Sequence, residues 1–530
     1  MVGTRRSLRE LIALHKNGGQ ELNNFIRALR GIQRLPPTDE NSFFHIAGTH
    51  GEPFRKRDGD WRFGGADITI VPGVMLPYWD ECFDSTSPLP DVLTNPVFLL
   101  DGDDNNPLYS YKLQQALKDT ESGKEDQYSK PQGYTTVRYP LSGLVGTQED
   151  RGNTEAHNQK YGPVAENELN KNLKEWMLGT VKIDTSGGEE KTGTPDTYSI
   201  YSRFKLCMDA PNYTVFSNTT SQNAWIEQET KRPVDENRNY VVSLESPHNA
   251  IHLAIGGFFQ SGIYNANPIR GANGDMGDNE TASFDPIFFL HHCFIDYVFW
   301  KWQVKQNFTE RGSLKFIKDF KGTFSEEAAQ PFIPPYTNLH EETPLRPFTK
   351  SDGNFYTTLD VTNITELGYE YGVGSFDLIA PTPDIPATEI QTKSLAPFTA
   401  YKKVSGIDRG KIRGSFIIYL NARDANGNEV VIGREPILSR WQTAGCLNCQ
   451  THLNAEAIFA IDENTLNSLK GTRKKGGLQT EEHSPQELEF WGTVGTRDKE
   501  HKKYFDAPQG HGILEGDQPR EEIKPIVIDL

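Results

Sequence analysis

The sequence predicts a mainly α-helical N-terminal unit followed by a smaller β-rich unit, and three observations carry this prediction. Apolar residues recur at helical spacing over 7–34 and over 246–306. Four prolines interrupt 377–397, which indicates an exposed linker. Beyond it, short strand-like runs alternate with turn residues, as is typical of a small β-sandwich. We therefore expect a helical domain over 1–376, a linker over 377–397 and a β-rich domain over 398–530.

Composition narrows the class of protein. The chain has 530 residues, of which 36% are hydrophobic and 11% aromatic, so it can form more than one core. Its formal net charge of −17 argues against a nucleic-acid partner and suits small neutral substrates. No apolar run reaches the roughly 18 residues that a membrane span needs. The first residues lead into an amphipathic helix and not an apolar leader, so we expect an intracellular protein without a membrane partner.

The N-terminal elements follow from spacing and breakers. We expect one or two amphipathic helices over 7–34, broken at Gly18-Gly19 and ended by the prolines after residue 35. Residues 67–71 suit a short strand. From 85 to 239 the chain is polar and rich in turn residues, so we expect loops there, with His157 in one of them.

A first histidine pair lies at the start of a predicted helix. Ser246 is a good N-cap residue, and Gly256-Gly257 provides the stop. His248 and His252 are four residues apart, so both imidazoles project from one helical face. A third imidazole from another buried helix would complete a metal site.

A second histidine pair lies in a longer, phenylalanine-rich helix. Asp285 suits its N-cap, and its apolar residues extend the helix to about Gln306. His291 and His292 point about 100° apart on an ideal helix, so we expect only one of them to face a shared metal. Asp296, one turn after His292, could orient a ligand imidazole by a hydrogen bond to the ring nitrogen that does not bind the metal.

The histidines alone do not identify the metal. Imidazole suits copper, zinc, iron and nickel, so the ligand type does not choose among them. Two unrelated pairs of core histidines are the structural alternative. The spacing of the first pair, combined with a His-His pair in a buried helix, favours the metal site over that alternative.

Three segments of this region match one family pattern in order: Leu244–His252 (LESPHNAIH), Gly274–Asn279 (GDMGDN) and Ser283–Asp296 (SFDPIFFLHHCFID). Together they resemble the copper-B half of a type 3 copper protein and are most similar to fungal tyrosinases. The resemblance covers most of the chain. It implies a type 3 copper helical-bundle core, with Glu245 and Asn249 beside the site.

The resemblance also implies a ligand set and a reaction. His248, His252 and His292 match the copper-B ligands, and His292 is favoured over His291 because the family ligand lies four residues before the helix aspartate. The family has a dinuclear copper centre that hydroxylates phenols and oxidises catechols to quinones with dioxygen, as in melanin-type pigment chemistry. The implied partners are therefore a phenolic or catecholic small molecule and dioxygen, and a homo-oligomer is compatible with them.

The copper-A half departs from the family pattern. Phe43–Gly51 resembles the stretch that supplies the first copper-A ligand, which would be His50. The family then continues with two further copper-A histidines, whereas this chain has none between His50 and His157. The pattern returns abruptly at Leu76–Glu81. The gap over 55–74 leaves copper A doubtful, and the abrupt return favours a deletion or a lost exon over gradual drift.

The C-terminal region resembles the domain that shields the copper site in fungal pro-tyrosinases. We expect its strands near 415–420, 429–432 and 457–461. Cys446 and Cys449 form a Cys-x-x-Cys that matches a family motif proposed to carry copper to the site. A zinc half-site, a redox pair and a simple structural pair remain alternatives.

Two functions therefore compete. By resemblance, the chain is a copper oxidoreductase that oxidises phenols and catechols. The missing copper-A histidines instead favour an impaired or inactive homologue that binds one copper or none. An oxygen carrier of the same fold would also need both coppers, so the same gap counts against it.

Overall fold

The computed structural model describes residues 2–52, 73–83, 88–118, 129–179, 198–231, 240–257, 269, 271–323, 337–377, 398–412, 414–425, 427–440, 453–470, 488–496 and 525–530. The linker expected over 377–397, apart from its first residue, lies outside the described residues. So do the predicted strand at 67–71, most of the gap over 55–74, and both Cys446 and Cys449.

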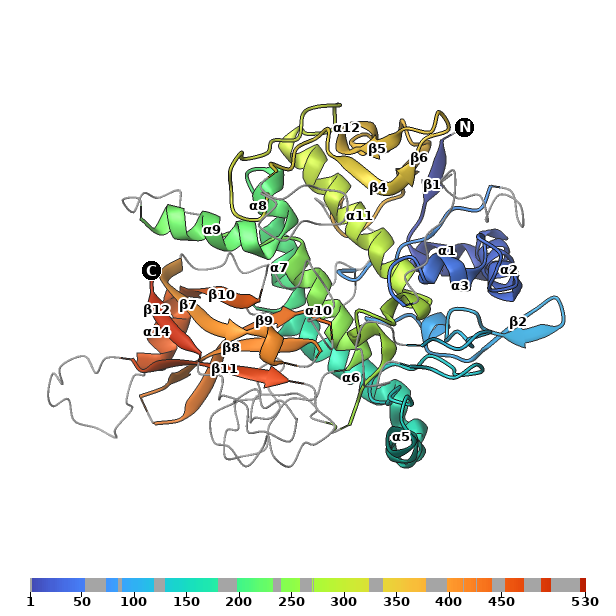
Figure 1. The fold of residues 1–530 in the computed structure, drawn as a ribbon, viewed down its shortest axis with the longest axis horizontal. Helices are drawn as coiled ribbons and strands as arrows, with labels where there is room; N and C mark the ends of the chain where they lie inside the picture. The colour runs from blue at the N-terminus through green and yellow to red at the C-terminus, as the bar shows by residue number, and fades with distance from the viewer. Residues whose placement is uncertain are drawn as a thin grey trace, which may run out of the picture.

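The described part is helical up to residue 377 and mainly stranded from 398 onward, which confirms the predicted fold class (Figure 1). The helices are α1 Leu8–Lys16, α2 Glu21–Arg34, α3 Phe43–Ala47, α5 Gln148–Tyr161, α6 Ala165–Leu178, α7 Ile200–Cys207, α8 Tyr213–Ser217, α9 Thr219–Thr230, α10 Glu245–Gly256, α11 Ile287–Gln306, α12 Thr358–Val361 and α14 Glu463–Lys470. The strands are β1 Gly3–Arg5, β2 Val97–Leu100, β3 Asp103–Asn105, β4 Pro344–Thr349, β5 Phe355–Thr357, β6 Tyr369–Tyr371, β7 Phe398–Asp408, β8 Phe416–Arg423, β9 Glu429–Ile437, β10 Asn454–Asp462, β11 Phe490–Thr496 and β12 Ile526–Asp529.

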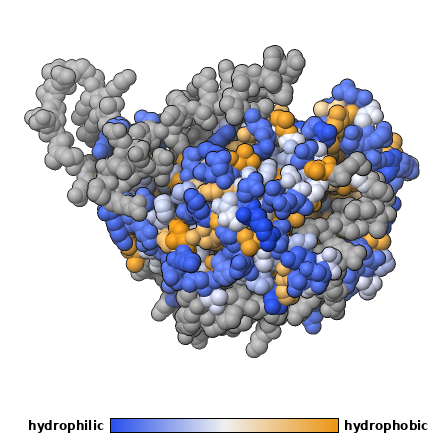
Figure 2. Space-filling view, turned by 90° about the horizontal axis from the view of Figure 1, so that it is seen from above, coloured by the Kyte–Doolittle hydropathy of each residue, from blue (hydrophilic) through white to orange (hydrophobic). Residues whose placement is uncertain are grey.

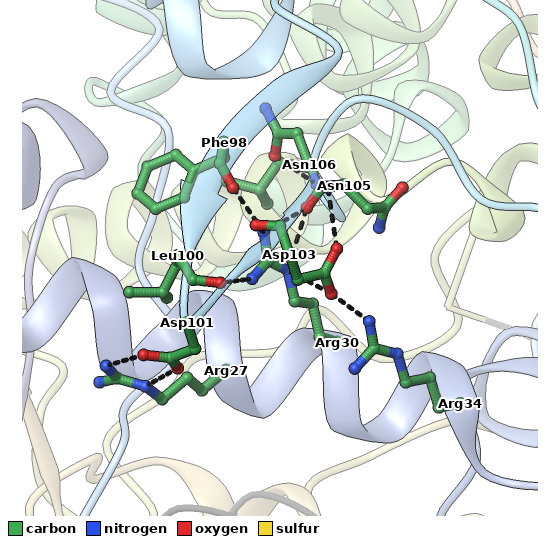
Figure 3. A network of polar contacts seen from close by, with 10 residues as sticks. Arg27, Arg30, Arg34, Phe98, Leu100, Asp101, Asp103, Asn105 and Asn106 are labelled. Carbon is green, nitrogen blue, oxygen red and sulfur yellow. Dashed lines mark hydrogen bonds and ion pairs between the residues drawn. The ribbon is translucent and has the colours of Figure 1, made fainter.

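The predicted N-terminal helices are confirmed as α1 and α2. Ser7 caps α1 by accepting a hydrogen bond from the backbone N–H of Glu10 at 3.1 Å. The apolar face of α2 is buried, as its spacing predicts. Arg30, on the same helix, donates hydrogen bonds to backbone carbonyls of the β2–β3 hairpin, and Figure 3 shows this network with its neighbouring ion pairs.

The expectation of loops between 85 and 239 is wrong for much of that region, because α5 to α9 lie within it. His157 belongs to α5 and not to a loop. These helices carry few apolar residues in a regular pattern, so their periodicity is weak in the sequence. Tertiary packing stabilises several of them, since residues such as Leu173 and Phe204 are buried in the main core.

The C-terminal strands form two three-stranded antiparallel sheets, in the orders β10-β7-β12 and β11-β8-β9. Their facing apolar residues share one core, which includes Val404, Ile418 and Phe459. We call this unit the C-terminal sandwich. Its β8 and β9 also join the core of the helical unit through Ile417, Tyr419 and others, so the two units pack directly together.

Helix α11 is the central element of the helical unit (Figure 1). Tyr78 stacks on Tyr297 with ring centroids 4.8 Å apart, and Phe216 stacks on Trp302 at 4.2 Å. The N-terminal strand β1 pairs in parallel with β6 near the end of the helical unit. These contacts hold α11 from several sides.

The visible surface is mostly polar. On the face in Figure 2, hydrophilic residues predominate and hydrophobic residues are scattered among them. Within the described ranges, no helix combines the length and the apolar character needed to cross a membrane.

Candidate metal centre

Four histidines from two helices meet in the interior. Helix α10 contributes His248 and His252, and α11 contributes His291 and His292; each offers a ring nitrogen, and these nitrogens all lie within 4.8 Å of one another. His248 Nε2 and His292 Nε2 are 3.3 Å apart. We call this group the histidine cluster. It contains every residue predicted for copper B.

The start of α10 differs from the prediction. The helix begins at Glu245, so Ser246 lies in its first turn and is not the N-cap. The Ser246 hydroxyl instead hydrogen-bonds to Glu435 in the C-terminal sandwich. The predicted end at Gly256-Gly257 is confirmed, and so is the end of α11 at Gln306. The Ser246 hydroxyl, which the sequence pattern assigns to helix capping, therefore makes a tertiary contact instead.

Three of the imidazoles are held at Nδ1 by a neighbouring oxygen. His248 bonds to Asn249 Oδ1 at 2.9 Å, and His252 donates to the backbone carbonyl of Met276 at 2.8 Å. His291 bonds to Glu81 Oε1 at 2.6 Å. A bond at Nδ1 fixes the ring orientation and leaves Nε2 to bind a metal.

The carboxyl group that hydrogen-bonds to an imidazole of the cluster belongs to Glu81. The expectation that Asp296 plays this part is wrong. Asp296 accepts hydrogen bonds from Arg5 at 3.2 Å and from the Tyr369 hydroxyl at 2.8 Å. Glu81 reaches the cluster because its segment runs along α11, where the backbone N–H of Trp79 donates to the carbonyl of Leu290 at 3.2 Å. The sequence signal for Glu81 was its place in the family-like stretch 76–81.

Both His291 and His292 lie in the cluster, and which of them would face a bound metal stays a prediction. Their ring planes are 75° apart and their centroids 5.2 Å apart, yet each offers a nitrogen to the same group. The reason is the close approach of α10, since the His248 ring lies 5.1 Å from that of His291 and 4.9 Å from that of His292. One helix thus meets both side chains of its neighbour.

The cluster has the chemistry of a metal site. Among the described residues, His252 Nε2 and His291 Nε2 are buried without a hydrogen-bond partner, an arrangement that costs free energy unless something binds there. Burial lowers the pKa of all four histidines, and for His252, His291 and His292 well below the ordinary value. The imidazoles are therefore neutral at pH 7, which is the form that binds metals.

His50 lies beside the cluster. Its ring centroid is 6.2 Å from that of His292 and 4.7 Å from that of Phe288. Partial burial of the ring, together with the charges of His248 and Arg440, lowers the pKa of His50 to about 4. The structure thus brings the predicted copper-A histidine next to the predicted copper-B set.

Four other described histidines lie away from the cluster, and one of them, His45, is buried on α3. His157 bonds through Nε2 to the carbonyl of Pro140 at 2.7 Å, and the ring of His15 lies 5.9 Å from that of Phe98. His340 is exposed. A cavity of about 960 Å³ near α1, α2 and Phe98 is lined by none of the cluster histidines.

Comparisons with known proteins agree with this geometry. The family model for the common central domain of tyrosinase matches residues 65–305. The tyrosinase HcTyr2 of Hahella sp. (strain CCB-MM4) is 42% identical over 506 residues, covering 87% of this chain and 88% of that protein. The chain belongs to the tyrosinase family. A tyrosinase of Aspergillus oryzae is 36% identical, with 90% of this chain and 92% of that protein covered.

A solved structure supports the same family. The tyrosinase from Burkholderia thailandensis at low pH has a TM-score of 0.74 and 35% sequence identity, with both chains covered in full. Tyrosinases are copper oxidoreductases, and the histidine cluster supplies the imidazoles that copper needs. The resemblance to the family and the copper cofactor predicted from the sequence are therefore confirmed.

Proposed function

We propose that this chain oxidises monophenols, o-diphenols or both to o-quinones with dioxygen, using copper at the histidine cluster. The observation that carries the proposal is the meeting of the cluster's ring nitrogens within 4.8 Å of one another in a tyrosinase-family chain. His248, His252 and His292 would hold copper B, and His50 would serve copper A. Copper held there would supply the redox chemistry: a monophenol would gain one oxygen atom of dioxygen while the other leaves as water, whereas two o-diphenols would together reduce one dioxygen to two waters.

The chain's own groups would prepare this site. Asn249 and Met276 hold the rings of His248 and His252 at Nδ1, so these two proposed ligands need little reorganisation when the metal binds. Glu81 holds the neighbouring ring of His291 in the same way. Since the imidazoles are already neutral at pH 7, no proton has to leave them. His248 and His292 are half-buried, whereas the other two cluster histidines are buried, so a substrate would approach from the side of the half-buried pair.

A second candidate is an impaired homologue that binds one copper or none. A specific observation favours it: beside the histidine cluster, His50 is the single copper-A ligand that the family pattern matches, and His157 bonds to Pro140 instead. A copper held by one or two imidazoles binds weakly and does not keep a fixed distance from its neighbour.

Copper content tests the ligand set. His252→Ala should remove most copper bound at the cluster, as measured by elemental analysis of the purified full chain. His157→Ala serves as the matched control and should leave copper unchanged. His292→Ala should lose more copper than His291→Ala if the family assignment holds. Unchanged copper in His252→Ala would contradict the site.

Activity separates the two candidates. The copper-loaded chain should be assayed for quinone formation from catechol, both intact and after cleavage in 377–397 with the C-terminal fragment separated in mild urea, so that shielding cannot explain a negative result. Two coppers per chain with sustained quinone formation would support the oxidase and contradict the impaired homologue. One copper or fewer, with little quinone formation in either form, would support the impaired homologue.

A further inference from the structure

The copper-binding helix α10 is joined to the C-terminal sandwich by a buried polar network. Glu435 on β9 accepts a hydrogen bond from the Ser246 hydroxyl at 2.6 Å and one from Arg203 Nη1 at 2.5 Å. Arg203, on α7, also contacts Ser246 directly. The relative exposures of Glu435, Arg203 and Ser246 are 5%, 3% and 0%. Ser246 lies in the first turn of α10, two residues before His248.

A second contact reaches the other histidine of α10. The hydroxyl of Ser415, just before β8, donates to the carbonyl of Gly277 at 3.1 Å. The preceding residue, Met276, accepts the Nδ1–H of His252 at 2.8 Å. Ser415 and His252 are both buried. The sandwich thus contacts the first turn of α10, which carries His248, and the residue next to the one that holds the ring of His252.

The hydrogen bonds of this network restrict the position of α10 relative to the sandwich. Its carboxylate takes a charge-assisted bond from Arg203, and Arg203 continues to the backbone carbonyls of Arg434 on β9 and of Tyr198. A buried carboxylate that lost its partners would carry a large desolvation penalty, so the network tolerates few alternative positions of α10. Apolar packing alone would permit a small rotation or slide of the helix. Figure 1 shows β9 lying alongside α10.

We propose that the C-terminal sandwich positions the metal-binding histidines of α10, with Glu435 as the central positioning residue acting through Ser246. The role differs from that of a shield, because it makes the metal geometry depend on the sandwich. The inference rests on the proposed function in that it takes the histidine cluster as the copper site. It concerns the geometry of that site and not the reaction rate.

The test uses cobalt(II) in the full chain, because the visible absorption bands of cobalt report the geometry of its donor atoms. Glu435→Gln should weaken cobalt affinity about tenfold or more and shift these bands, as is typical when a residue behind a ligand is replaced. Glu456→Gln is the matched control. Glu456 also bridges the sandwich to the helical unit, through Lys321 at 3.0 Å, but it contacts neither α10 nor the cluster in the described interactions.

The outcomes are separable. A folded Glu435→Gln chain, with wild-type circular dichroism, that keeps the wild-type cobalt affinity and spectrum would overturn the inference. If that variant does not fold, Ser246→Ala and Ser415→Ala decide, and unaltered spectra and affinities in both would overturn it. Wild-type chain that takes up no cobalt at the cluster, judged against His252→Ala, would contradict the proposed function and this inference with it.

Discussion

The buried ion pair between Arg138 and Asp285, next to the start of α11, tests how burial sets the strength of an ion pair. The N-cap of α11 is Pro286 and not the expected Asp285, which lies one residue earlier, and Arg138 binds Asp285 with two parallel bonds of 2.7 and 2.6 Å. Arg138 also donates to the carbonyls of Leu93 at 2.5 Å and Leu108 at 2.8 Å. The two charged side chains are only 7% and 1% exposed. Arg138→Met would therefore strand a buried carboxylate at the start of the helix that carries two cluster histidines.

The expected cost follows from that burial. Removing one partner of a buried pair costs about 3–5 kcal/mol in free energy of unfolding. The control is Arg27→Met, because Arg27 binds Asp101 with the same two-bond geometry, at 2.6 and 2.9 Å, while the side chains are 35% and 55% exposed (Figure 3). An exposed pair contributes about 0.2–1 kcal/mol. The loss in free energy of unfolding should therefore be severalfold larger for Arg138→Met than for Arg27→Met.

The assay is equilibrium urea unfolding of the metal-free chain, followed by tryptophan fluorescence. A double variant, Arg138→Met with Asp285→Leu, should recover part of the loss, because it removes the stranded charge. If Arg138→Met does not accumulate as folded protein, Asp285→Asn takes its place. A loss below about 1 kcal/mol for Arg138→Met, equal to that for Arg27→Met, would refute the reasoning from burial.

Two further predictions concern the C-terminal half. Limited proteolysis should cut first within 377–397, and the two fragments should stay together in native size-exclusion chromatography because the sandwich shares a core with the helical unit; first cuts within 240–306 would contradict the domain division. A double serine variant of Cys446 and Cys449, produced without added metal, should contain less copper at the histidine cluster and recover when copper is supplied directly, because two soft thiolates suit cuprous ion. Normal loading under limiting copper would leave the pair a structural role.

Several elements of this protein could be read from local pattern. The breaks at Gly18-Gly19 and at Gly256-Gly257 were predictable, because paired glycines favour a helix end, and Gly18 and Gly257 adopt the positive φ that other residues avoid. The long apolar helix to Gln306 was predictable because most of its residues before the last turn are buried or half-buried and apolar. Helices α5 to α9 were missed because their apolar spacing is irregular and packing against neighbours stabilises them.

The sequence by itself determined the metal-binding residue types, the pairing of His248 with His252 on one face, and the family. These depend on spacing within a single helix, which the chain carries locally. Only the tertiary structure decided that His291 joins the cluster, that Glu81 and not Asp296 lies behind an imidazole, and that the Ser246 hydroxyl bonds to Glu435. Each of these contacts joins segments distant in sequence, and which side chains meet there depends on how the helices cross and where the sandwich packs.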